Sequence, residues 1–424
     1  MKTRIQSIVV VITLLFPGLL IKLQAVNPAP DGCYPNFTTA EGCDAVNLLT
    51  TGAANTGLGW RSLFSDTTGS FNTGVGAGAL VLNNADSNTA VGTAALLLNT
   101  DGTKNTAIGT AALVNNDTAE QNTATGAFAL TSHVSGNGNT AMGANALFSD
   151  ASGQLNTAIG AGALFSNVGG PFPGSFNTAV GAGALFNSTG GDNTAVGAGA
   201  LNGNTSGDEN LAIGVSALAS NQSGSRNIAF GSFAGNGLMT GNDNIYIGYN
   251  LGAAAGDSNT CHIKSIFGQT AAGGSAVYVD ANHKLGTMTS SKRYKEDIKP
   301  IDTASNSLFA LNPVTFHYKK EIDPTGTSQF GLVAEEVEKV NPDLIVRDKD
   351  GKPNSVRYDQ VNSMLLNEFL KEHKRVEEQQ ATIAEMKSEM KALAATVHEQ
   401  AVELQQVKTE MQIKSPASVI VRNH

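Results

Sequence analysis

Apolar and polar positions recur in a fixed short pattern over the middle of the chain. One phrase returns twelve times, close to Asn-Thr-Ala-x-Gly-x-x-Ala-Leu, with a small apolar residue at the fourth place. Nearly all successive copies are 16 or 17 residues apart, and the exception carries an insert before Asn177. Such a period indicates one small unit stacked along an axis. The anchoring asparagines are Asn55, Asn72, Asn88, Asn105, Asn122, Asn139, Asn156, Asn177, Asn193, Asn210, Asn227 and Asn244.

Each repeat predicts a very short strand and a tight turn, because its apolar positions alternate, as in Thr178-Ala179-Val180-Gly181. The glycine at the fifth place permits a positive φ or a close approach of two backbones. We expect the recurring asparagines to form ladders whose amides hydrogen-bond from coil to coil. One coil cannot bury enough apolar area alone, so stacking must supply a core, which we expect to be thin and shared between chains.

These repeats resemble the head repeats of trimeric autotransporter adhesins, over about Asn55 to Gly248. The resemblance implies a left-handed parallel β-roll in a bundle of three chains. We therefore predict a mainly β protein whose rod occupies residues 55–250 and is followed by a β connector over residues 251–287.

Composition and charge narrow the classes of function. The chain has 47 glycines and only 6% aromatic residues, which argues against one large globular core. Residues 26–289 contain 5 Lys and Arg against 15 Asp and Glu, while residues 290–424 contain 19 against 21. A rod with so few basic groups is a poor binder of nucleic acid or anionic membranes. We expect no cofactor and no metal.

The first 25 residues read as an export signal. Lys2 and Arg4 form a basic start, Ile8 to Leu20 an apolar run, and Leu23-Gln24-Ala25 a small-residue exit. A membrane anchor that is not cleaved is the alternative, although Lys22 interrupts the apolar stretch. We expect an exported protein, extracellular or at the cell surface, with no membrane span once the signal is removed.

Two cysteines lie in the segment 26–54 that follows the signal. Export permits a disulfide between Cys33 and Cys43, and an interchain bond is an open alternative. Cys261 has no obvious partner.

Four ordered motifs follow a predicted β-hairpin at residues 276–286. Together they look like the S74 peptidase family, the intramolecular chaperone domain of phage tailspikes and endosialidases, over about residues 288–411. We assign residues 288–360 to this small α+β domain. The motifs begin with Ser290-Ser291-Lys292-Arg293-Tyr294-Lys295-Glu296-Asp297-Ile298, and continue at residues 311–319, 330–337 and 356–359.

The first motif has the residues for a Ser-Lys autoprotease. A serine hydroxyl is a weak nucleophile unless a base takes its proton, and an amine can do so if its surroundings keep it uncharged. Lys292 and Arg293 are candidate cationic neighbours of Lys295. The family motif maps onto Ser290 as nucleophile, Lys295 as base and Arg293 in support. The family usually has Asp after the nucleophile, whereas this chain has Ser291, an alternative nucleophile.

The last long segment, residues 361–411, predicts a coiled coil, and residues 412–424 a tail. Two seven-residue series alternate in steps of three and four, as a coiled-coil seam requires. The first series is apolar throughout, whereas polar residues interrupt the second. A lone amphipathic helix is the alternative. We choose a coiled coil of three helices because the rod and the end module both resemble trimers. The series are Phe369, Val376, Ile383, Met390, Val397, Leu404 and Met411, and Leu365, Glu372, Gln379, Met386, Leu393, Gln400 and Val407.

Our leading interpretation is a secreted or surface-displayed homotrimeric fibre, adhesin-like, whose C-terminal module drives assembly and cleaves itself. The only enzymatic activity expected is one autoproteolytic turnover, without an external substrate. The alternative is a fibre resembling a tailspike that degrades or binds polysaccharide. Glycan hydrolysis needs two carboxylates in a cleft, and the acids of the rod are scattered. A released transcription factor is disfavoured because no basic DNA-binding segment is found.

Overall fold

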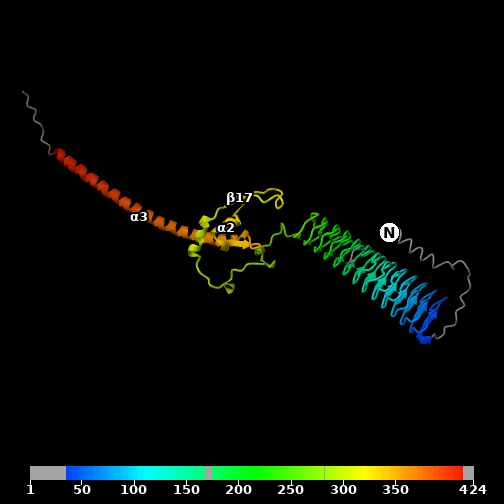
Figure 1. Ribbon diagram of the computed structural model, residues 1–424. Helices are drawn as coiled ribbons and strands as arrows, with labels where there is room; N and C mark the ends of the chain where they lie inside the picture. Colours follow the sequence, from blue (N-terminus) through cyan, green and yellow to red (C-terminus); the bar gives the residue numbers. More distant parts are fainter. Residues whose placement is uncertain (1–34, 168–173, 281, 414–424) are drawn as a thin grey trace, which may run out of the picture. The chain divides into compact units, whose positions relative to one another are not determined.

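The computed structural model describes residues 35–167, 174–280 and 282–413 (Figure 1). The chain divides into two compact units, with the boundary between Thr270 and Ala271. The predicted signal segment and Cys33 lie outside the described residues, so the export signal and the Cys33–Cys43 disulfide stay predictions. Cys43 is exposed. Within the described ranges, no helix combines the length and apolar character needed to cross a membrane.

The first unit is a parallel β-solenoid, which confirms the predicted mainly β fold. After a short 3-10 turn, η1 (Pro35–Phe37), one three-residue strand per coil pairs with the strand of the next coil, in chain order and in register (Figure 1). The strands are β1 (Thr39–Glu41), β2 (Thr56–Leu58), β3 (Thr73–Val75), β4 (Thr89–Val91), β5 (Thr106–Ile108), β6 (Thr123–Thr125), β7 (Thr140–Met142), β8 (Thr157–Ile159), β9 (Thr178–Val180), β10 (Thr194–Val196), β11 (Leu211–Ile213), β12 (Ile228–Phe230), β13 (Ile245–Ile247) and β14 (Cys261–Ile263).

The solenoid extends beyond residues 55–250 at both ends. β1 pairs with β2, and β14 pairs with β13, so parts of the assigned N-terminal segment and connector belong to the rod. The pattern missed these coils because threonine, Thr38 or Thr260, stands where the repeat has its asparagine. Thr260 takes part in the ladder: its backbone N–H and its hydroxyl donate to Asn244 Oδ1 at 3.1 and 2.8 Å.

The core of the rod closes within one chain. In a typical coil, the strand centre Ala90 and the following Ala95 and Leu96 are fully buried. The same places are buried from coil to coil and form one continuous apolar cluster. The expectation of a core shared between chains was therefore wrong for these residues: each coil places its alanines and leucine inside, and the coils above and below cover them.

The predicted asparagine ladder is confirmed. Asn88 receives a hydrogen bond on Oδ1 from the backbone N–H of Asn105, and its own backbone N–H donates to Asn72 Oδ1, both at 2.9 Å. Its Nδ2 donates to the Gly102 carbonyl at 2.8 Å. The asparagines are buried, so these bonds satisfy groups that would be costly to leave unpaired.

A second buried polar column runs beside the first. Asn99 Nδ2 donates to Asn83 Oδ1 at 2.7 Å and to the Gly102 carbonyl at 2.9 Å. The sequence pattern gave these stretches only as variable turns, because Asp, His and Ser replace Asn in several coils. The column contains Asp66, Asn83, Asn99, Asn116, His133, Asp150, Asn167, Ser188, Asn204 and Asn221, all fully buried.

Glycine at the fifth place of the repeat lets neighbouring coils meet. At this place the glycines have φ between 117° and 139°. A Cβ on Gly109 would lie 2.6 Å from the carbonyl carbon and oxygen of Gly126 in the next coil. Both predicted reasons for glycine, positive φ and close backbone approach, therefore apply together.

We predict that Gly109→Ala destabilises the rod. The backbone conformation alone should cost about 1–3 kcal/mol, and the steric clash with Gly126 adds to that cost. Thermal unfolding measures the loss. Gly256→Ala is the matched control, because Gly256 has no positive φ and its Cβ would meet only Thr240 Oγ1 at 3.9 Å. An equal loss in both variants would contradict this account.

We also predict that Asp66→Asn stabilises the rod at alkaline pH. Burial raises the pKa of Asp66 from 3.8 to about 6, although the Gly69 N–H donates to its Oδ1 at 2.8 Å. Because the folded pKa lies above the unfolded one, stability present below pH 4 is lost as pH rises through 6. Asparagine carries no such penalty, so the variant should gain about 2–3 kcal/mol at pH 8 and almost nothing at pH 3.

Chemical denaturation at both pH values tests this expectation. The exposed Asp101→Asn is the control and should show no gain that grows with pH. A gain at pH 8 no larger than that of the control would refute the proposed burial penalty.

The second unit is small and α+β, as predicted. Its three antiparallel strand pairs include the expected hairpin. Its core contains Val337, Leu344, Ile345, Val356, Val361 and Met364. The elements are β15 (Tyr278–Val279), β16 (Leu285–Gly286), η2 (Lys292–Tyr294), η3 (Asp302–Ala310), β17 (Val314–Phe316), β18 (Gln329–Gly331), α2 (Ala334–Val340), η4 (Pro342–Leu344), β19 (Ile345–Arg347), β20 (Pro353–Val356) and α3 (Tyr358–Ile413), where η denotes a 3-10 helix.

Candidate functional site

The candidate serines lie where the chain enters the single turn η2. Ser291 is the N-cap residue of this turn, and its Oγ accepts hydrogen bonds from the backbone N–H of Arg293 at 3.4 Å and from Arg293 Nε at 3.3 Å. A capping serine satisfies N–H groups that the turn leaves free. The hydroxyl of Ser291 therefore has a structural role in the turn.

The hydroxyl of Ser290 faces the candidate base instead. Lys295, directly after η2, donates from Nζ to Ser290 Oγ at 3.4 Å. The turn brings together two side chains five positions apart. The geometry thus distinguishes the two serines: Ser290 contacts the lysine, whereas Ser291 contacts Arg293.

The pair is open to water in the single chain, where both Ser290 and Lys295 are exposed. Proton transfer needs a separation of about 2.6–3.2 Å, and catalytic hydrogen bonds often tighten only in the reacting complex. The guanidinium of Arg293 lies 5.4 Å from the ring centre of Tyr294, and its Nε donates a hydrogen bond to Ser291 Oγ. Arg293 therefore supports the turn. The separation of 3.4 Å between Lys295 Nζ and Ser290 Oγ is therefore longer than proton transfer requires.

A polar cluster joins η3 to α3 in the same unit. The buried Ser305 accepts from Asn367 Nδ2 at 2.7 Å and donates to Glu368. Lys371 Nζ donates to Glu368 Oε1 and to the Asp302 carbonyl, both at 2.6 Å. Lys371, and then Ser305, lower the pKa of Glu368. The sequence pattern missed this cluster because more than sixty residues separate its two sides.

A family comparison matches this part of the chain. Residues 290–346 match the family model of peptidase S74, described as the chaperone of endosialidase. We call residues 290–346 the S74 segment. The match begins at Ser290 and lies within the domain assigned to residues 288–360. No curated protein and no solved structure matches the chain.

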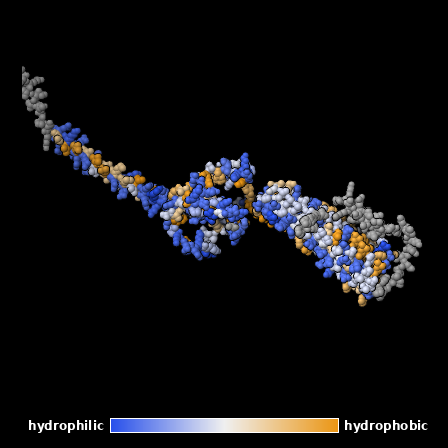
Figure 2. Space-filling view, in the orientation of Figure 1, coloured by the Kyte–Doolittle hydropathy of each residue, from blue (hydrophilic) through white to orange (hydrophobic). Residues whose placement is uncertain are grey.

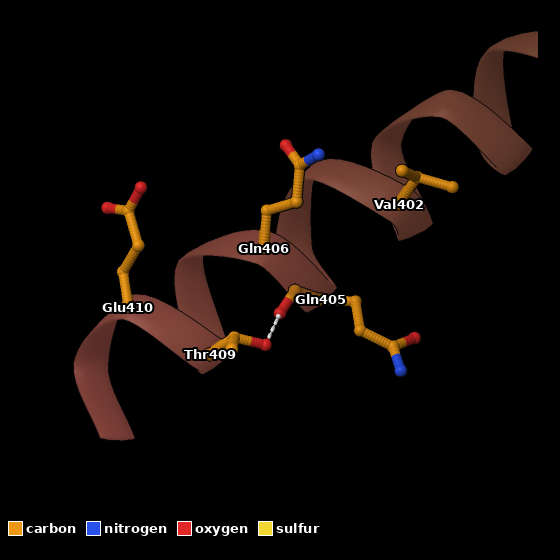
Figure 3. A pocket seen from close by; sticks show the side chains of 5 residues that line it. All are labelled: Val402, Gln405, Gln406, Thr409 and Glu410. Atoms are coloured by element: carbon orange, nitrogen blue, oxygen red, sulfur yellow. Dashed lines mark hydrogen bonds between the residues drawn. The ribbon is translucent and has the colours of Figure 1, made fainter. Parts of the chain in front are cut away.

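A depression on the surface of α3 does not resemble a binding site. It is lined by Val402, Gln405, Gln406, Thr409 and Glu410, which all belong to one helix (Figure 3). Thr409 donates to the Gln405 carbonyl of that helix at 2.8 Å. A single helix cannot enclose a ligand. Among the described residues, no group of three or more His, Cys, Asp or Glu side chains is placed to hold a metal ion.

Proposed function

We propose that this protein is an exported homotrimeric fibre whose S74 segment and terminal helix assemble three chains and then separate from the rod by self-cleavage. The β-solenoid supplies a stiff repetitive body for display or attachment. The S74 match supports an assembly role for the second unit. Three long rods need such a device, because identical repeats offer many wrong alignments.

The two-sided character of α3 carries this proposal. At its start, Val361 and Met364 pack into the small core of the same chain. The two neighbouring seam residues, Leu365 and Phe369, are 53% and 66% exposed. Hydrophobic surface stays exposed along the helix (Figure 2). One face of α3 thus holds the chain's own domain, while the apolar seam is free for other chains, as a coiled coil needs.

The apolar seam residues beyond Phe369 continue this exposed face. They are Val376, Ile383, Met386, Met390, Leu393, Val397, Leu404, Val407 and Met411, all exposed. A long helix with so many uncovered apolar side chains is poorly stable alone in water, and packing against two copies would bury them.

We predict a mass of three subunits for the intact chain in analytical ultracentrifugation, and its loss in Ile383→Asp. A carboxylate in the seam would be buried between three helices at a cost of several kcal/mol. Ala381→Asp, two positions away and outside both seam series, is the matched control and should stay trimeric. A monomeric wild-type chain at micromolar concentration would refute the proposal.

The proposed cleavage is an acyl transfer followed by hydrolysis. Ser290 Oγ attacks a neighbouring backbone carbonyl while Lys295 Nζ takes the hydroxyl proton. The peptide C–N bond breaks, the lysine returns the proton to the leaving amine, and an ester to Ser290 remains. Water then hydrolyses the ester and frees the C-terminal piece. Assembly would supply the ordering that the exposed single chain lacks.

We predict that wild-type protein is cut at Ser290 after assembly, whereas Ser290→Ala and Lys295→Ala each leave a full-length trimer. Ser291→Ala should still be cut, because its hydroxyl caps η2 and does not contact Lys295. Intact-mass spectrometry of the purified proteins gives the answer. Wild-type protein that stays whole once trimeric would leave the module a retained chaperone only. Cleavage in Ser290→Ala but not in Ser291→Ala would identify Ser291 as the nucleophile.

A further inference from the structure

The outer face of the strand row is free of charge over most of the rod. Each strand from β2 to β13 buries its middle residue and turns its first and third residues outward. The first residue is threonine in every strand from β2 to β10. The third is apolar in all twelve strands except β6, and none of these outward residues is charged. In-register pairing aligns them as two columns along the rod.

The face changes at its C-terminal end. In β11, β12 and β13 the threonine is replaced by Leu211, Ile228 and Ile245, so that both columns become apolar. We call these three residues, with Ile213, Phe230 and Ile247, the terminal patch. Ile228 and Ile247 are each 39% exposed and Phe230 is 56% exposed. The described chain therefore leaves a broad apolar surface uncovered here, unlike the mixed face of the earlier coils.

We propose that the three rods contact one another at the terminal patch, and that this contact sets their register. This inference rests on the proposed trimer. A surface without charge can meet identical copies around an axis without like-charge repulsion. The columns run parallel to the stacking direction, so three identical rods can align them coil against coil.

The terminal patch distinguishes a correct register from a slipped one. Coils β2 to β10 present nearly the same outward residues, so a slip by one coil exchanges equivalent contacts. At the terminal patch, the same slip moves β11 of one rod against the threonine coil β10 of its neighbour. It also moves β13 against β14, whose first residue is Cys261. The residues of the rod thus distinguish the correct register from a slipped one, close to the end after which the S74 segment follows in the chain.

A cross-linking experiment tests this role. In a Ser290→Ala chain with Cys33, Cys43 and Cys261 changed to Ser, one version carries Val91→Cys and a second carries Ile108→Cys. The two are produced together and oxidised, and peptide mapping compares 91–91 and 108–108 disulfides with mixed 91–108 disulfides. Mixed pairs report a slip by one coil.

The triple variant Leu211→Thr, Ile228→Thr and Ile245→Thr restores the threonine of the earlier coils, so it should fold. It should raise the mixed share severalfold over the parent. The control makes three aliphatic-to-threonine changes elsewhere on the same face, at Leu58, Val75 and Ile159, and should leave the share unchanged.

Three results would overturn the inference. Trimers without any cross-links would show that this face is not between copies. An unchanged share in the triple variant would show that other elements set the register, and an equal rise in the control would show that the terminal patch has no special part. A monomeric parent would instead refute the proposed trimer.

Discussion

The close approach of one coil's backbone to the next is the constraint on which the rod depends. At the glycine corner a Cβ would lie only about 2.5–2.8 Å from the neighbouring coil over most of the rod. This close approach goes together with small residues at most strand centres, which are alanine in most coils, although β13 has the buried Tyr246 there. It also brings each asparagine within hydrogen-bonding distance of the next. Glycine, alanine and asparagine therefore act as one set: each is useful because the others keep the coils close.

The interior of the rod is polar as well as apolar. Two columns of buried side chains hydrogen-bond from coil to coil, and in most coils amides do this without charge. Where ionisable groups enter the second column, they need partners or incur a cost. His133 Nδ1 lies 3.1 Å from Asp150 Oδ2, with both side chains fully buried. Asp66 instead accepts hydrogen bonds from uncharged groups, the Gly69 backbone N–H and Asn72 Nδ2, and burial raises its pKa. The rod therefore tolerates variation in this column at a local cost in stability.

Two faces of the helix α3 have different surroundings in the second unit. The beginning of α3 is held to η3 by Ser305, Glu368 and Lys371 and by the small core, while its seam stays uncovered. In the proposed trimer, this arrangement would transmit helix assembly to the S74 segment, because these contacts connect α3 to η3, which lies within residues 290–346. In the proposed mechanism, the exposed Ser290–Lys295 pair becomes ordered only after assembly.

The sequence by itself determined the elements that depend on local spacing. The repeat period predicted the stacked coils, and the fifth-place glycine predicted its own backbone conformation. The first-column asparagines predicted their ladder, and the heptad spacing predicted the long helix. These follow from residues whose partners lie one period away. Only the tertiary structure decided which groups meet where the repeat has another residue, or where the partners are far apart in the sequence. It placed Thr38 and Thr260 in the end coils, joined Asp66, His133 and Asn99 in one buried column, and paired Ser305 with Glu368. It also separated the environments of Ser290 and Ser291, because hydrogen bonds depend on side-chain direction, which residue order does not specify.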